Sequence, residues 1–247
     1  YPKSLYAVQD ALSVINLNKN ALILDFFAGS GTTLHAVNLL NAMDDGCRRC
    51  ILVTNNEVSE DEAKTLTKEG FYPGDEGWER YGIARYVTWP RTVCSIKGID
   101  VNGNPIQGTY LSNNKPMSEG FAANVEYFKL GFLDKNSVSL GQQFAEILPL
   151  LWLKAGAIGK RPELDSAELP NMLILPQNSF AVLLDEDCYG KFAEALLETK
   201  NIGTVYFVTN SEEAFREMSD GIGIEQTYQL YRDYIDNFVI GSRRNNL

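Results

Sequence analysis

The stretch from Ala21 to Thr33 constrains the fold of this chain more than any other. It begins with an apolar run, Ala21 to Leu24, of the kind that forms a buried parallel strand. A Gly-Ser-Gly turn follows at residues 29–31, and apolar residues then recur at helical spacing from Leu34 to Met43. The order of strand, tight turn and helix predicts a βαβ unit of an α/β domain, with a second strand at residues 51–54.

The two glycines of this turn, Gly29 and Gly31, carry no Cβ and let the backbone approach a ligand closely. The helix N-terminus behind them offers unpaired N–H groups to an anion. A dinucleotide fingerprint would need glycine where Leu34 stands, and a phosphate-binding loop would need a lysine after Gly31. A nucleotide-binding oxidoreductase domain is therefore disfavoured but remains an alternative, as does an ordinary strand-to-helix turn without a ligand.

Three segments in order carry a resemblance to a known family. Residues 25–33, Asp-Phe-Phe-Ala-Gly-Ser-Gly-Thr-Thr, resemble motif I of the amino-methylating DNA methyltransferases, which bind S-adenosylmethionine (SAM). Residues 1–12 are similar to motif X, and residues 50–57, Cys-Ile-Leu-Val-Thr-Asn-Asn-Glu, are similar to motif II. This order resembles the β class, and the closest resemblance is to modification subunits of type III restriction systems and related adenine-specific methylases. Weaker similarity continues through residues 80–91.

The resemblance implies a Rossmann-like SAM site at the carboxyl ends of strands 21–26 and 51–54. It places the adenosine near residues 25–31, both ribose hydroxyls on Glu57, and residues 1–20 over the methionine end of the cofactor. The cofactor-binding residues implied in this way are Pro2, Lys3, Ser4, Asp25, Phe26, Phe27, Ala28, Gly29, Ser30, Gly31, Thr32, Thr33, Asn56 and Glu57.

Several of these side chains have an alternative interpretation. Glu57 taken alone is typical of a solvated acid at a helix start, and Phe26 and Phe27 are typical of core residues, although one of them is a candidate to face the ligand. The next segment holds three arginines, at positions 80, 85 and 91. They either touch phosphate or, as their acidic neighbours favour, form ion pairs on a surface helix.

The resembled family also needs a catalytic loop of the type Asp/Asn/Ser-Pro-Pro-Tyr/Phe/Trp, which holds the flipped base. No two prolines are adjacent anywhere in the 247 residues. In the β class this loop and the target-recognition region precede motif X, the motif at which this chain begins. We therefore expect the C-terminal part of a larger, site-specific DNA adenine methyltransferase, inactive alone, that meets DNA through the full-length protein. A restriction subunit and a second copy of the chain are further candidate partners.

Composition fits this expectation. The net charge of −10 is unfavourable for an autonomous DNA binder, which normally shows a basic surface, but suits a part whose DNA-reading surface lies elsewhere. No apolar run approaches the ~20 residues of a membrane span, and the start does not resemble a signal peptide. Four cysteines indicate a reducing cytoplasm rather than a disulfide framework. Cys47 and Cys50 have C-x-x-C spacing, but one such pair does not supply the four ligands of a structural zinc site.

The predicted organisation has three parts. Residues 1–100 form a partial SAM-binding domain, and residues 101–120, rich in Asn, Gly, Ser and Pro, form a linker or hairpin with a short strand at 106–111. Residues 121–247 form a second, smaller α/β accessory domain. Ser59 begins a capping box, and a helix over residues 78–87 is expected to be interrupted or kinked at Pro90.

The accessory domain shows no catalytic constellation, and it is a candidate for a non-enzymatic assembly module of a restriction-modification complex. Its acidic residues at 185–187 and 212–213 are typical of N-caps and first-turn charges. The strands predicted there are 125–130, 172–175, 180–184, 204–208, 226–231 and 238–240, and the helices are 139–155, 191–199 and 211–218.

Overall fold

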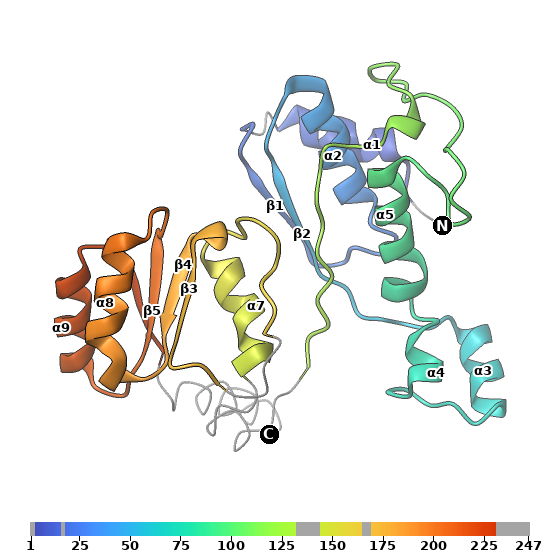
Figure 1. The fold of residues 1–247 in the computed structure, drawn as a ribbon. Helices are drawn as coiled ribbons and strands as arrows, with labels where there is room; N and C mark the ends of the chain where they lie inside the picture. Colours follow the sequence, from blue (N-terminus) through green and yellow to red (C-terminus); the bar gives the residue numbers. More distant parts are fainter. Residues whose placement is uncertain (1–2, 16–17, 132–143, 165–168, 231–247) are drawn as a thin grey trace. The chain divides into compact units, whose positions relative to one another are not determined.

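The computed structural model describes residues 3–15, 18–131, 144–164 and 169–230 (Figure 1). The chain divides into two compact units, Tyr1–Lys129 and Leu130–Leu247. Each unit combines helices with a sheet, so the mixed α/β class predicted from the sequence is confirmed. In the described ranges, none of the helices combines the length and the apolar character needed to cross a bilayer.

The first unit is built on the predicted βαβ arrangement. Strand β1 (Leu22–Asp25) pairs in parallel with β2 (Arg49–Leu52), with Leu24 opposite Ile51, and helix α2 (Thr32–Asp44) connects them. Helix α2 packs on β2, and its residues Ala36, Val37 and Leu40 are buried. Helix α1 (Leu5–Val14) packs in turn against α2 (Figure 1).

The other face of this two-stranded sheet carries exposed apolar side chains. Leu22 and Leu24 of β1 and Ile51 of β2 are each about half exposed, at 54%, 50% and 47%. Alternate residues of a strand point to opposite faces, and paired residues of neighbouring strands share a face. These three side chains therefore form one apolar surface, which we call the open sheet face.

A series of short helices follows β2. Helix α3 (Glu60–Lys68) begins with the predicted capping box, because the Ser59 hydroxyl accepts from the Glu62 amide and donates to the Glu62 carboxylate. The helix predicted over residues 78–87 divides into two pieces, since α4 spans Glu76–Glu79 and a π-helical turn spans Ala84–Thr88. Helix α5 (Trp89–Lys97) continues directly from that turn. Pro90 stands in its first turn, next to the point where the π-helical turn changes to an α-helix.

Residues 101–120, expected as a linker or hairpin, lie inside the first unit, which ends at Lys129. Tyr110 is only 1% exposed, and its hydroxyl lies 2.8 Å from His35 Nε2 in α2. The amide of Leu111 donates to Tyr6 Oη, and the Ser112 hydroxyl donates to Gln9 Oε1, which ties this loop to α1. The strand expected at 106–111 is absent from this described stretch, where only isolated bridges such as Thr109 to Pro116 occur.

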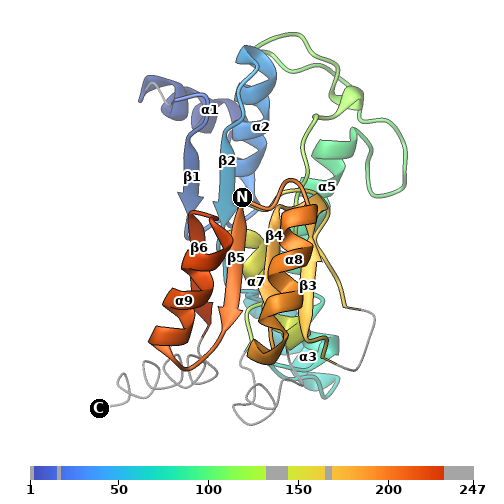
Figure 2. The same ribbon diagram turned by 60° about the vertical axis from the view of Figure 1, so that its left-hand side comes forward.

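The second unit is a sheet of order β3-β4-β5-β6 between two helical layers (Figure 2). The strands are β3 (Met172–Leu175), β4 (Phe180–Leu183), β5 (Thr204–Val208) and β6 (Gln226–Leu230). Strands β4, β5 and β6 are parallel, and β3 is antiparallel to β4. Helices α8 (Tyr189–Glu198) and α9 (Glu212–Ile222) cover one face, and α7 (Phe144–Lys154) covers the other.

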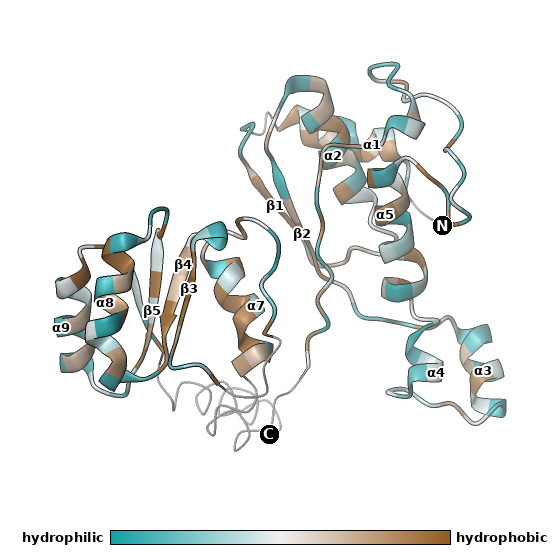
Figure 3. Cartoon of the chain, viewed as in Figure 1, coloured by the Kyte–Doolittle hydropathy of each residue, from teal (hydrophilic) through white to brown (hydrophobic). Residues whose placement is uncertain are grey.

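Alternation along β4 and β5 explains the two layers of this unit. Ala181 and Leu183 pack with Phe192 of α8 in one core cluster. Phe180 and Tyr206 point to the opposite face, where the Tyr206 hydroxyl donates to the Leu151 carbonyl of α7. Hydrophobic residues accordingly concentrate in β3, β4 and α7, whereas α3 and α4 are largely hydrophilic (Figure 3).

Most elements predicted in residues 121–247 are present, with ends shifted by a few residues. The strand predicted at 125–130 is wrong, because these residues form neither a helix nor a strand and pair with no strand in the described part of the chain. The strand predicted at 238–240 and the first residues, 139–143, of the predicted helix 139–155 lie outside the described residues.

Candidate functional site

The turn after β1 is held in a left-handed conformation by its glycines. Gly29 has φ +50° and Gly31 has φ +77°, a region that residues with a Cβ avoid. Gly31 is the N-cap of α2. Because glycine has no side chain, it does not cap the first amides of the helix. The turn also joins the sheet, since the Ala28 amide donates to the Val53 carbonyl.

Asp25 braces the strand side of this glycine turn. Its Oδ1 accepts from the Phe27 amide at 3.0 Å, and its Oδ2 accepts from the Thr33 hydroxyl at 2.6 Å. The carboxylate thus links the end of β1 to the first turn of α2. Of the residues between, Ala28 is buried, whereas Phe26 and Phe27 are 62% and 91% exposed, so the core interpretation of these two rings is wrong.

Glu57 lies beyond the end of β2, at the same edge of the sheet as Asp25, because the strands are parallel. Its side chain is exposed, and its backbone carbonyl accepts from the Ile83 amide at 2.8 Å. Among the described residues, its carboxylate receives a single long contact, 3.5 Å from Asn55 Nδ2. This leaves most of its acceptor capacity free for a ligand.

Asn56 directs its side chain into the protein instead. Its Nδ2 donates to the backbone carbonyl and the carboxylate of Glu79, and its Oδ1 accepts from the Arg85 amide. The bond from Asn56 is the largest cause that lowers the pKa of Glu79 below its usual range. A Cβ on Gly82 would collide with the Asn56 amide, so the two residues are closely packed. The polar groups of Asn56 are thereby used within the fold.

The segment before α1 contributes less defined groups. Lys3 and Ser4 are exposed, and Ser4 is the N-cap of α1 without a hydrogen bond from its side chain. Neither residue is hydrogen-bonded to the glycine turn in the described part of the chain. Pro2 lies outside the described residues.

Two residues that the sequence did not assign to the cofactor site contact the glycine turn, one from the π-helical turn and one from α5. The Thr88 hydroxyl donates to the Gly29 carbonyl, and Arg91 Nη1 donates to Ser30 and Thr32. The surface ion pair predicted for Arg91 is thus not found among the described residues, where its Nη1 contacts the turn, and the predicted phosphate contact stays a prediction. The ion-pair prediction does hold for Arg85, which pairs with Glu76 at 2.9 Å.

Cys50 of the C-x-x-C pair lies in β2. Burial, with Asp25 nearby, raises the pKa of the Cys50 thiol to about 12. In the absence of a metal ion, this thiol therefore stays protonated at neutral pH.

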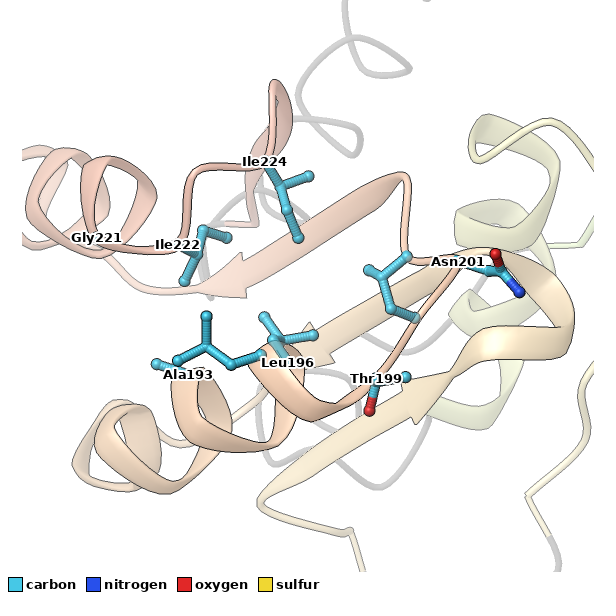
Figure 4. Close-up of a pocket in the computed structure, with 9 residues that line it drawn as sticks. Ala193, Leu196, Thr199, Asn201, Gly221, Ile222 and Ile224 are labelled. Atoms are coloured by element: carbon cyan, nitrogen blue, oxygen red, sulfur yellow. The ribbon is translucent and has the colours of Figure 1, made fainter.

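Two features of the second unit resemble sites, a hollow and an acidic group. A hollow of about 190 Å³ lies between the C-terminal ends of α8 and α9, with apolar residues such as Leu196 and Ile222 on its walls (Figure 4). Ligand pockets are typically ~300 Å³ or larger, so it is small for a cofactor. The acidic group at residues 185–187 is explained by capping, as predicted, since Asp185 Oδ1 accepts from the Asp187 amide.

Comparisons with known proteins agree with the resemblance read from the motifs. No family model matches the chain. Part of it, however, is similar to DNA methyltransferases of restriction-modification systems. It is 51% identical over 57 residues to the type II methyltransferase M.KpnI of Klebsiella pneumoniae, a stretch that covers 22% of this chain and 13% of that protein.

Two type III modification subunits are similar over comparable stretches. The EcoPI Mod subunit of Escherichia phage P1 is 47% identical over 57 residues, 23% of this chain and 9% of that protein. The StyLTI Mod subunit of Salmonella typhimurium is 45% identical over 69 residues, 28% of this chain and 10% of that protein. The matched stretches thus span about a tenth of the length of these curated relatives.

Proposed function

We propose that the first unit is part of the SAM-binding domain of a site-specific DNA adenine methyltransferase with a Rossmann-like fold. The observation that carries this proposal is the joint placement of the glycine turn and the exposed Glu57 carboxylate at one edge of the β1-β2 sheet. In open α/β sheets, ligands bind at this edge. The similarity to methyltransferases of restriction-modification systems supports the same assignment.

The residues at this edge fit the parts of SAM. A carboxylate accepts two hydroxyl protons at once, so Glu57 would hold both ribose hydroxyls. The turn from Asp25 to Gly31 would line the adenosine, because a Cβ built on Gly29 meets little besides the Phe27 carbonyl and space remains there. SAM supplies an activated methyl group, and the role of these residues is to bind and orient it.

The whole protein is proposed to be larger than this chain. The open sheet face, with half-exposed Leu22, Leu24 and Ile51, supports this, since an apolar sheet surface normally packs against a further layer. We propose DNA as the substrate, reached through the full-length protein in the cytoplasm, and a restriction subunit or a second copy of the chain as protein partners. Residues of the second unit would serve as an accessory or assembly module.

Titration calorimetry with SAM tests the cofactor site. We expect the E57A variant to bind SAM about 10- to 150-fold more weakly than the wild-type chain, because hydrogen bonds to a charged group contribute roughly 1.5–3 kcal/mol. E60A removes another exposed carboxylate, in the first turn of α3, and serves as the matched control. Equal affinity of wild type and E57A would remove Glu57 from the site, and binding of NAD in preference to SAM would favour the oxidoreductase alternative.

The second test concerns activity. We expect the purified chain to transfer no methyl group to DNA, because its sequence has no Pro-Pro loop to hold the target amine in line with the methyl donor. Incorporation of tritiated methyl groups into DNA by this chain alone, above the level of a reaction without protein, would contradict the expectation.

A further inference from the structure

Helix α5 contacts the glycine turn through Arg91. One guanidinium nitrogen, Nη1, lies 3.2 Å from the Ser30 carbonyl oxygen, 2.7 Å from Ser30 Oγ and 2.9 Å from Thr32 Oγ1. The guanidinium is half-buried, and the described residues give it no carboxylate partner. Arg91 is thus committed to the turn rather than to a surface ion pair.

Thr88 supports the same turn one helical turn earlier. Its hydroxyl is within hydrogen-bonding distance of the Gly29 carbonyl. It also lies 3.0 Å from the carbonyl oxygen of Ile83, the residue five positions before it. Thr88 is the last residue of the π-helical turn, an element often found at functional sites. A Cβ on Gly31 would lie 3.1 Å from Thr88 Cγ2, so helix and turn are in direct contact.

Residues 83–91 also contact the backbone of Glu57. The Ile83 amide donates to the Glu57 carbonyl, and the Arg85 amide donates to the side chain of Asn56. Residues 83–91 therefore contact both halves of the candidate site, the glycine turn on one side and, on the other, the backbone of Glu57 and the side chain of Asn56. Their spacing is fixed by this segment rather than by the two strands alone.

Resting on the proposed function, we propose that Arg91 and Thr88 are positioning residues for SAM binding. They act through the glycine turn and do not touch the cofactor. Arg91 fixes the side chains of Ser30 and Thr32, and Thr88 fixes the Gly29 carbonyl, so that the amides at the start of α2 are oriented before the ligand arrives. Preorganisation of this kind raises affinity because less ordering remains to be done on binding.

The test uses the whole 247-residue chain and two measurements on it. The first is hydrogen exchange at the amides of residues 29–33 without any ligand, which reports on the turn alone. The second is SAM affinity by calorimetry, which depends on the turn and on the proposed function. We expect R91A and T88V to increase exchange at 29–33 and to weaken SAM binding about tenfold.

Conservative variants separate positioning from bulk packing. T88S keeps the hydroxyl and R91K keeps a cationic donor, so both variants are expected to bind SAM within about threefold of the wild-type affinity. T88V has nearly the shape of threonine but lacks the hydroxyl, so it tests the hydrogen bond alone. K97A, at an exposed position in the last turn of α5, is the control for loss of a positive charge on the same helix.

The outcomes distinguish the two hypotheses. Wild-type exchange and affinity in both R91A and T88V would overturn the positioning role. Faster exchange that extends equally to α1 and α2 in T88V would also overturn it, because it would show a general loss of stability. If the wild-type chain binds no SAM, the proposed function fails, and exchange at residues 29–33 still decides whether Arg91 and Thr88 order the turn.

Discussion

Replacing Gly120 with alanine is expected to destabilise the first unit by about 3–4 kcal/mol. Gly120 is buried, at φ +57° and ψ −153°, a backbone region that is essentially restricted to glycine. An added Cβ would fall on the Ile96 carbonyl oxygen, which is backbone and accepts a hydrogen bond from the Phe121 amide. Backbone strain and this steric overlap therefore add, and neither is relieved by rotating a side chain.

A second glycine of the same loop provides the control. Gly103 also has a positive φ, +85°, but a Cβ there would meet open space. The G103A variant should therefore lose only the conformational term, about 1–2 kcal/mol. The measurement is hydrogen exchange at the buried amides of α2, in the core of the first unit. Equal protection of α2 in G120A and G103A would contradict the close packing of this loop on α5.

The packing of residues 101–120 could be predicted from the sequence only in part. The Asn- and Gly-rich composition of residues 101–120 correctly indicates turns but gives no information on what they pack against. Tyr110 fixes the loop to α2 through a residue that is far away in sequence. Gly120 fixes the loop to α5 through backbone atoms, which carry no sequence signal. Composition alone therefore suggested a linker where the structure has an integral part of the first unit.

Local patterns succeeded where the physical cause was local. The strand, glycine turn and helix at residues 21–44 follow from an apolar run, two residues free of a Cβ and a 3.6-residue period. The Ser59 capping box depends on residues three apart. By contrast, Val125 to Leu130 alternates like a strand, but a strand also needs a partner backbone, which no alternation reveals.

The candidate site shows the same division. The glycine turn and Glu57 were located from motifs in adjacent stretches of sequence. Arg91 and Thr88 reach that turn from about 60 positions away, and their neighbours in sequence indicate a phosphate contact or a charged surface helix but not this turn. Asn56 illustrates the opposite limit, because its place beside Glu57 in a motif does not show that its amide is used inside the fold.

The second large effect is expected from pH. His35, the single histidine of the sequence, lies in α2 with its ring edge-on to Tyr110 and Phe121. Its Nδ1 is buried without a hydrogen-bond partner in the described structure. Burial, followed by the positive charge of Arg91, lowers the pKa of His35 from 6.5 to about 4. The folded state therefore resists a proton that the unfolded chain accepts readily.

The sign of the pH dependence follows from this difference. The contribution of neutral His35 to stability is complete above pH 6.5 and is lost as the pH falls through the window from 6.5 to about 4. Over the interval from pH 7 to pH 5, the expected loss in unfolding free energy is about 2 kcal/mol, since each pKa unit corresponds to ~1.4 kcal/mol. Other groups, chiefly carboxylates, also begin to titrate near the lower end of this range.

A single substitution separates His35 from those groups. Glutamine at position 35 offers a neutral amide near the Tyr110 hydroxyl and carries no titrating group, so H35Q should lose about 2 kcal/mol less stability than the wild type between pH 7 and pH 5. Urea unfolding monitored by hydrogen exchange in α2 measures the difference at both pH values, and the carboxylate contribution cancels because both proteins share it. Parallel pH profiles for wild type and H35Q would show that the imidazole accepts its proton in the folded state at little cost, and would contradict its burial against Tyr110, Phe121 and Arg91.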